Sequence, residues 1–270
     1  MSHVFEPRHL FLMKATLSRF SFILALVFLS FTAKAALLAY EGFNYETSVV
    51  GTLSGLQGGE PVCDVGWAGA WGHEYISTKD ASSAISLGSV NKTGVRSTGN
   101  KAVFYRRLWR KLGPEIRRTE GEVWIGFFYA ANKTKATGTI QLQGSAREAG
   151  VPVTVTVTFS ANSNLKLGSV DLGKAPGTNQ HFLLFKVSFS VDGNKVSLWV
   201  DPDLTNGMDE GVEPSAVLET TDNWGLTGIQ FVNNSATTNS YTVDEIRFGD
   251  TARDAIWPIV QSVSTTIILY

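Results

Sequence analysis

The stretch LLFKVSFSV-DG-NKVSLWVD, residues 183–201, contains the clearest fold signal in the sequence. It consists of residues 183–191, the dipeptide Asp192-Gly193 and residues 194–201. Apolar and polar residues alternate on both sides of Asp-Gly, and a period of two predicts half-buried β-strands. Asp-Gly between two such runs is a strong hairpin signal, because a type I′ turn needs positive φ at both central residues. The sequence therefore predicts an antiparallel β-hairpin.

The register of this hairpin follows from counting outward from a two-residue turn. The count places the apolar side chains of both strands on one face and the more polar side chains on the other. We therefore expect one face of the hairpin to lie on a core and the opposite face to be solvated. The expected pairs are Val191 with Asn194, Phe189 with Val196, Val187 with Leu198, Phe185 with Val200, Ser188 with Ser197 and Lys186 with Trp199.

Alternation elsewhere predicts further strands. Residues 151–160 alternate Val or Phe with Thr or Ser, and residues 137–143 alternate apolar residues with Thr139, Gln141 and Gln143. Residues 123–129 are apolar on both faces and predict a central strand. Other candidate segments are residues 37–43, 102–108, 227–232 and 241–248, the last with a change of apolar parity at Asp244-Glu245 that predicts a bulge.

Helical periodicity is limited to a short turn at residues 253–256, and no internal repeat is visible. Many short strands separated by Gly, Asn and Asp turns are typical of an antiparallel sandwich. The predicted fold class is therefore all-β, an antiparallel β-sandwich of the jelly-roll type. We expect one core over residues 36–258 and a tail or edge strand over residues 259–270.

The first 35 residues are typical of a secretory signal peptide. Residues 20–31 are uncharged, Lys14 and Arg19 precede them, and Ala33-Lys34-Ala35 follows as a small-residue cleavage site. A retained membrane anchor would need about 20 apolar residues, and Lys34 interrupts the run. We expect a signal peptide helix over residues 1–35, with Met13 as a possible true start. The mature chain is then secreted, periplasmic or held at the cell surface.

The charge balance excludes whole classes of partner. Lys and Arg number 23 against 24 Asp and Glu, and removing residues 1–35 leaves 19 against 23, a net charge of −4. A mildly acidic chain has no global field to attract nucleic acid, so we expect no nucleic-acid partner and, after signal cleavage, no membrane span. One cysteine, Cys63, and four histidines exclude a disulfide scaffold, a zinc finger and an iron–sulfur site within one chain.

Four short segments carry a family resemblance: Leu38–Phe43 (LAYEGF), Gly66–Gly72 (GWAGAWG), Leu198–Pro202 (LWVDP) and Val243–Gly249 (VDEIRFG). Together they resemble exported bacterial proteins with concanavalin A-like lectin/glucanase (laminin G-like) domains. The resemblance covers most of the mature chain, and its motifs are mainly structural. It implies a concanavalin A-like sandwich and, as partner, a polysaccharide or cell-surface glycan.

Aromatic and amide side chains are the candidate ligand-binding groups. Trp67 and Trp71 lie in a Gly-rich loop with Tyr75 nearby, where a sugar ring could stack on an open indole face. The alternative is that both indoles plug one end of the sandwich. Gln141 and Gln143 could line a concave sheet face and bond sugar hydroxyls, although a merely solvated sheet surface explains them equally well.

Calcium is the one cofactor that the sequence suggests. Residues 201–210 follow a strand and carry Asp201, Asp203, Asn206 and Asp209, and calcium takes six to eight oxygen ligands. The loop lacks the spacing of an EF-hand. Asp-Pro-Asp after a strand is also ordinary turn chemistry, because Asp side chains bond nearby backbone N–H groups.

No catalytic residue is assigned. Glycoside hydrolysis needs two carboxylates flanking the bond, and Glu120-Gly121-Glu122 and Asp244-Glu245 are the nearest candidates. Polysaccharide lyases on a similar fold pair Arg and Gln with a His or Tyr. Arg117-Arg118 and Gln141-Leu142-Gln143 are the nearest match to the first two, whereas the candidates for the third, His181 and Tyr241, lie elsewhere in the sequence. The sequence favours a secreted module that binds carbohydrate or a surface polymer without turnover. A polysaccharide-cleaving enzyme and a structural envelope or adhesion module stay open as alternatives.

Overall fold

The computed structural model describes residues 37–43, 45, 66–73, 83–86, 95, 100–116, 118–134, 136–146, 152–234 and 239–256. The chain divides into two compact units, Met1–Lys34 and Ala35–Tyr270, and the described residues all belong to the second. The predicted signal peptide, the possible start at Met13, Cys63 and the tail at 259–270 lie outside them. Within these ranges no helix is long and apolar enough to cross a membrane.

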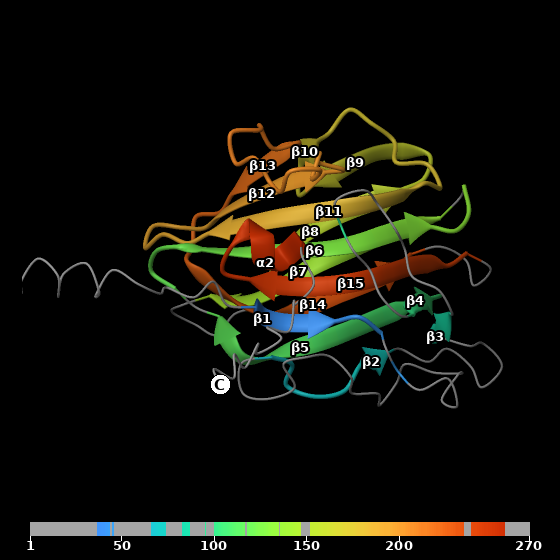
Figure 1. Cartoon of the computed structure of the whole chain (residues 1–270), viewed down its shortest axis with the longest axis horizontal. Helices are drawn as coiled ribbons and strands as arrows, with labels where there is room; N and C mark the ends of the chain where they lie inside the picture. The colour runs from blue at the N-terminus through green and yellow to red at the C-terminus, as the bar shows by residue number, and fades with distance from the viewer. Residues whose placement is uncertain are drawn as a thin grey trace, which may run out of the picture. The chain divides into compact units, whose positions relative to one another are not determined.

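Two antiparallel sheets form the fold (Figure 1). The first sheet runs in the order β13 (Ala216–Glu219), β12 (Lys195–Val200), β11 (Gln180–Ser188), β6 (Glu122–Ala131), β15 (Tyr241–Gly249), β4 (Lys101–Phe104) and β3 (Ser83–Ser86), with β1 (Leu37–Glu41) paired to β15. The second runs in the order β10 (Val170–Asp171), β9 (Ser163–Leu167), β8 (Pro152–Ser160), β7 (Thr137–Ala146), β14 (Trp224–Asn233), β5 (Arg107–Ile116) and β2 (Gly72–His73). The predicted all-β antiparallel sandwich is confirmed.

Aromatic side chains from both sheets fill the core between them. Phe127 on β6 meets Phe231 on β14 edge to face, with ring centroids 5.5 Å apart. Tyr129 on β6 meets Phe159 on β8 in the same way at 4.6 Å. All four side chains are fully buried. Edge-to-face contacts place the positive edge of one ring against the negative face of another, which is favourable. Because each contact joins a strand of the first sheet to a strand of the second, the two sheets share one core.

The outer face of the first sheet is also covered, contrary to the expected solvated face of the 183–201 hairpin. The short helix α2 (Ala252–Ile256) lies over β15 and β6 (Figure 1). Trp124, Leu184 and Trp199 form a second buried cluster with Leu204 and with Ala252, Ala255 and Ile256 of α2. The two indoles stack with their ring centroids 5.4 Å apart. The predicted turn near residue 253 is confirmed and supplies part of this cover.

The hairpin itself is confirmed, but its predicted register is wrong by two residues. Ser188 pairs with Lys195, Val187 with Val196 and Phe185 with Leu198. A type I′ turn does not form, because Gly193 has positive φ and Asp192 does not. Asn194 is instead held from elsewhere: its backbone N–H donates to the Thr220 hydroxyl at 3.0 Å, so it cannot pair with Val191. A shift of two keeps every side chain on its predicted face.

The expected single strand over residues 102–108 is also wrong, because the segment changes sheets. β4 ends at Phe104 in the first sheet and β5 begins at Arg107 in the second. Asn233 fixes the crossing: its side-chain amide donates to the Tyr105 carbonyl at 2.9 Å, and its backbone N–H donates to the Arg106 carbonyl at 2.7 Å.

Other strand predictions are confirmed. β7 and β8 alternate as expected, with Ile140 and Leu142 buried, and β6 is a central strand between β11 and β15. The parity change in β15 is a bulge, since its pairing with β6 shifts register after Asp244 and Glu245 has a φ of 54°.

Candidate functional site

The outer face of the second sheet carries a row of directly paired residues. Thr156 on β8 faces Gln141 on β7, Gln141 faces Gln230 on β14, and Gln230 faces Trp109 on β5. These side chains point outward because their chain neighbours point into the core. Thr154 and Gln143 form the start of the next row. We call the six residues the glutamine platform: Thr154, Thr156, Gln141, Gln143, Gln230 and Trp109.

Hydrogen bonds join the three glutamines into a ladder. The Gln143 amide Nε2 donates to Gln230 Oε1 at 2.8 Å, and Gln230 Nε2 donates to Gln141 Oε1 at 3.0 Å. Each amide offers two N–H donors and a carbonyl with two lone pairs, so the ladder uses part of this capacity. The remaining donors and acceptors are held in fixed positions on a partly exposed surface. Such a surface suits ligands rich in hydroxyl groups.

Trp109 closes the row beside the ladder. It pairs with Gly72 of β2, and a Cβ built on Gly72 would lie 2.3 Å from Trp109 Cε2. The indole therefore lies flat on the glycine backbone, a close approach that only Gly permits. The rest of the indole is half-buried. A rigid aromatic face next to fixed amides is the arrangement that stacks on an apolar ring face and bonds the groups at its rim.

A buried ion pair fixes the chain beneath Trp109. The Arg110 guanidinium and the Glu41 carboxylate are both almost fully buried and form a hydrogen-bonded ion pair. Arg110 Nε also donates to the Gly69 carbonyl at 2.9 Å, tying the loop before Gly72 to β5. Burial raises the pKa of the Glu41 carboxyl, and the Arg110 charge opposes that shift. The pair couples β1, this loop and β5.

The predicted ligand groups Trp67 and Trp71 lie around this ion pair. Both indoles are buried, at 3% and 2% exposure. Trp67 Nε1 donates to the Tyr40 carbonyl at 2.9 Å, and Trp71 Nε1 donates to Glu41 Oε2 at 2.8 Å. The Arg110 guanidinium lies over both rings. This burial agrees with the packing alternative and leaves neither face open to a sugar. Tyr75 lies outside the described residues.

The acidic loop after β12 does not gather its oxygens around one point. Asp201 accepts from the Phe182 backbone N–H at 2.9 Å, Asp203 from the Thr205 backbone N–H at 3.0 Å, and Asp209 from the Gly211 backbone N–H at 2.9 Å. The bonds of Asp203 and Asp209 are Asx turns, which the alternative interpretation of the loop predicts, whereas Asp201 is bonded to the neighbouring strand β11. Over the described residues, no three His, Cys, Asp or Glu side chains are placed to hold a metal ion. Asn206 lines a separate shallow pocket with Met208. The loop therefore does not fit the suggested calcium.

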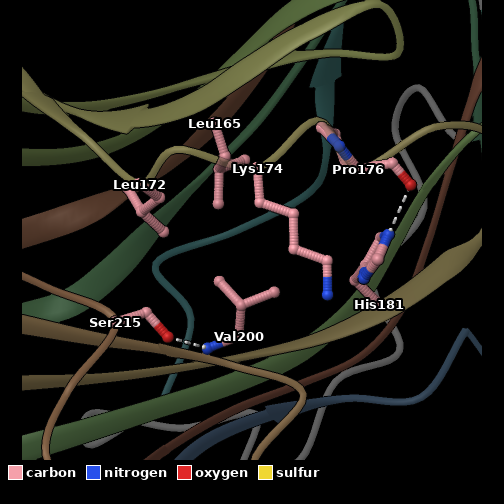
Figure 2. Close-up of a pocket in the computed structure, with 7 residues that line it drawn as sticks. All are labelled: Leu165, Leu172, Lys174, Pro176, His181, Val200 and Ser215. Carbon is pink, nitrogen blue, oxygen red and sulfur yellow. Dashed lines mark hydrogen bonds between the residues drawn. The ribbon is translucent and has the colours of Figure 1, made fainter.

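A small hollow opens beside β11, where residues 172–179 cross from the second sheet to the first (Figure 2). Its volume is about 170 Å³, and Figure 2 shows the Lys174 side chain reaching into it toward His181. His181 Nδ1 lies 2.5 Å from Asp201 Oδ2, and its Nε2 lies 2.9 Å from the Pro176 carbonyl. Because both ring nitrogens are engaged, His181 serves this crossing structurally. The hollow has no room for a polymer.

Of the candidate hydrolytic carboxylates, Glu120 is exposed, and Glu122, Asp244 and Glu245 are half-buried or buried within the fold. Glu245 is buried and paired with Arg247 at 2.5 Å, and Asp244 is fully buried. Glu122 accepts from Trp124 Nε1 at 2.6 Å and pairs with Lys186. None of these carboxylates lies on the glutamine platform. The described structure therefore brings no pair of them together over an open surface.

The candidate lyase set is likewise scattered. Gln141 and Gln143 lie on the outer face of the second sheet, whereas His181 lies on β11 of the first. Tyr241 is fully buried in the core, where its hydroxyl donates to the Phe159 carbonyl at 3.4 Å. Arg118 is paired with Asp250 near the start of β6, whereas His181 pairs with Tyr129 near the end of that strand. These groups cannot act on one substrate bond.

Charged side chains border the platform. Arg107 and Lys111 are exposed on β5, on the same face as Trp109. On β9, Lys166 lies 3.7 Å from Asp171 of β10. A hydrogen bond from the Gly173 backbone N–H lowers the pKa of Asp171, and Lys166 acts in the same direction. Asp171 therefore stays ionised beside Lys166 at neutral pH.

The sequence pattern alone indicates only part of this site. The structure places Gln141 and Gln143 on one open face, as the sequence-based prediction required, but it adds Gln230 and Trp109 as their partners. Gln230 carried a usable signal, because it alternates with Ile229 and Phe231. The residues around Trp109 contain no signal that its side chain lies on the outer face.

No protein-family model and no curated protein sequence matches the chain. Among solved structures it is similar to the carbohydrate recognition domain of Emp46p, with a TM-score of 0.35, 10% identity, and coverage of 63% of this chain and 88% of that one. Arcelin-5, a lectin-like defence protein from Phaseolus vulgaris, gives 0.34, 11%, 64% and 93%. A putative beta-glucanase from Mycobacterium abscessus gives 0.34, 10%, 55% and 75%. At this level of likeness nothing follows about the ligand or activity of this chain.

Proposed function

We propose that the protein is a secreted or cell-surface module that binds a polysaccharide or cell-surface glycan on the glutamine platform and does not cleave it. The observation that carries the proposal is the row Thr156, Gln141, Gln230 and Trp109, which crosses four strands on an open face. Neighbouring strands lie about 4.8 Å apart, so the row extends over about 14 Å. That length suits several units of a chain better than a single small molecule.

Each part of the platform has a role in this proposal. The Trp109 indole, immobilised on Gly72, stacks on the C–H face of one sugar ring. The glutamine ladder donates to and accepts from the hydroxyl groups of the adjoining units. Because the strands and the ladder already fix these side chains, little rotamer entropy is lost on binding.

The absence of turnover is supported by the placement of the acidic groups. At the described outward positions of β7, β8 and β14, and of β5 from Arg107 to Lys111, there is no Asp or Glu. Hydrolysis of a glycosidic bond needs two carboxyl groups about 5 to 10 Å apart across that bond. The described platform offers hydrogen bonds and an aromatic face without an acid and base pair.

Affinity electrophoresis in gels that contain individual polysaccharides tests the proposal. We expect at least one polymer to retard the purified protein, and Trp109→Ala to weaken its binding about tenfold, the loss of about 1.4 kcal/mol of stacking. Gln141→Ala is expected to weaken binding, whereas Gln180→Ala, an exposed glutamine on the first sheet, is the matched control and leaves it unchanged.

The same samples are assayed for new reducing ends and unsaturated products. A binding module is supported if a polymer retards the protein without new reducing ends, and if Trp109→Ala weakens this retardation while Gln180→Ala leaves it unchanged. New ends or unsaturated products would overturn the proposal in favour of a polysaccharide-cleaving enzyme. No retardation by any polymer would overturn it in favour of a structural envelope or adhesion module.

A further inference from the structure

The charges around the glutamine platform are opposite in sign to the charge of the mature chain. Arg107 and Lys111 flank Trp109 at two-residue spacing on β5, so each lies about 6.8 Å from it along the strand. Both are exposed. An aromatic ring between two cations therefore forms one border of the platform.

A third cation lies toward the other border. Lys166 of β9 pairs in register with Thr158 of β8, and its side chain is about half exposed, at 48%. Its partner Asp171 is the one acidic residue at the described outward positions of β7, β8, β9, β10 and β14 and of β5 from Arg107 to Lys111. Over these positions, three cationic side chains stand against one acidic side chain.

This excess is local and is not a consequence of composition. Without residues 1–35 the chain carries 19 Lys and Arg against 23 Asp and Glu. An acidic chain with randomly scattered charges would place an excess of carboxylates on an exposed sheet face. Lys111 forms no ion pair with a carboxylate of the described residues, so its charge is not used within this part of the fold.

We infer that the polymer bound on the glutamine platform is an acidic polysaccharide, an inference that rests on the proposed function. Its sugar rings lie over Trp109 and the glutamine ladder, and its carboxylate or sulfate groups meet Arg107 and Lys111. Arginine binds a planar carboxylate through two parallel N–H donors, and lysine acts as a point charge. An uncharged polysaccharide would make no use of these two side chains.

The test compares four polymers of matched length by affinity electrophoresis: a polyuronate, a sulfated galactan, an uncharged glucan and single-stranded DNA. For the purified protein at low salt we expect the polyuronate or the sulfated galactan to bind at least tenfold more tightly than the glucan. The difference should shrink as salt rises, because exposed charges are screened. Comparing the first two polymers identifies which acidic group is recognised.

The decisive variant is Arg107→Gln with Lys111→Gln. It is expected to lose the preference for the acidic polymer and to keep the residual binding of the uncharged glucan. Lys195→Gln with Arg253→Gln, an exposed pair on the first sheet and α2, removes the same charge elsewhere and should leave the preference intact.

The outcomes separate the two proposals. Equal binding of polyuronate, sulfated galactan and glucan, unchanged in the Arg107 and Lys111 variant, would overturn this inference while the proposed function stands. No retardation by any of the four polymers would overturn both. Binding of single-stranded DNA as tight as that of the acidic polysaccharides would show unspecific polyanion binding and would also overturn the inference.

Discussion

At the scale of single residues, Glu41 is the most consequential buried charge. Its carboxylate accepts from Arg110, Trp71, Tyr45 and the Phe43 backbone N–H. Glu41→Gln leaves the buried Arg110 charge without its counter-charge, so we expect the free energy of unfolding in urea to fall by about 3 to 5 kcal/mol. Glu219→Gln, at an exposed strand position, is the control and should change it by less than about 0.5 kcal/mol. A fall below about 1 kcal/mol in Glu41→Gln would contradict this role.

At Tyr129 we expect a substitution to raise the free energy of unfolding. Its hydroxyl is buried in the aromatic core with no hydrogen-bond partner among the described residues. Burial raises the pKa of this phenol, since the charged form would have no solvent. Tyr129→Phe removes an unsatisfied polar atom and keeps the ring, so we expect the protein to gain about 1 kcal/mol of stability. Tyr241→Phe, whose hydroxyl donates to Phe159, should not stabilise it. A loss of stability in Tyr129→Phe would refute the reasoning.

At the scale of elements, the pairing of β2 with β5 sets the position of the aromatic face. Gly72→Ala places a Cβ inside the Trp109 indole and is expected to displace the ring and weaken polysaccharide binding about as much as Trp109→Ala. A double-mutant cycle supplies the control, because Gly72→Ala should have no further effect in the Trp109→Ala background. Additive losses in the cycle would show that Gly72 acts on binding by another route.

Elements also show how far the sequence alone could predict this protein. Period-two alternation predicted β7, β8 and the faces of Gln141 and Gln143, because apolar and polar residues alternate regularly over residues 137–143 and 151–159. Trp109 was missed because Arg110 reverses the pattern: its charge reads as outward, yet the ion pair with Glu41 draws it inside and turns Trp109 outward. A partner 69 positions away in sequence decides this, and no local pattern contains it.

The two strand errors have the same origin. The hairpin register at Asp192-Gly193 is set by Thr220, which holds Asn194, and the crossing between β4 and β5 is set by Asn233. The local sequence predicted a two-residue turn at Asp192-Gly193 and one continuous strand over residues 102–108. Buried hydrogen bonds from distant segments outweighed it, since leaving a buried polar group unpaired costs more than a turn preference provides.

At the scale of the whole molecule, the charges predict a pH dependence of binding to a polyuronate. The Gly173 N–H lowers the pKa of Asp171, so this carboxylate stays ionised from pH 5 to 9. The platform charge is then constant, and affinity should be flat over this range. As the pH falls below about 4, the carboxyl groups of the polymer gain protons and lose their attraction to the cations. Binding should weaken there, whereas a sulfated polymer, which stays charged, is the control.

Affinity measured by electrophoresis between pH 3 and 9 checks this prediction. A rise in affinity for the polyuronate below pH 4, or equal weakening for the sulfated polymer, would show that groups of the protein rather than of the ligand titrate.

The central claim is that a polysaccharide chain lies across Gln141, Gln230 and Trp109. Nuclear magnetic resonance of the ¹⁵N-labelled protein during titration with a retained oligosaccharide tests it most directly. We expect shifts of the side-chain amide signals of Gln141, Gln143 and Gln230 and of the Trp109 indole N–H, with the buried Trp67 and Trp71 indoles unchanged. Shifts confined to residues 201–210 or to His181, with the glutamine signals unmoved, would contradict it.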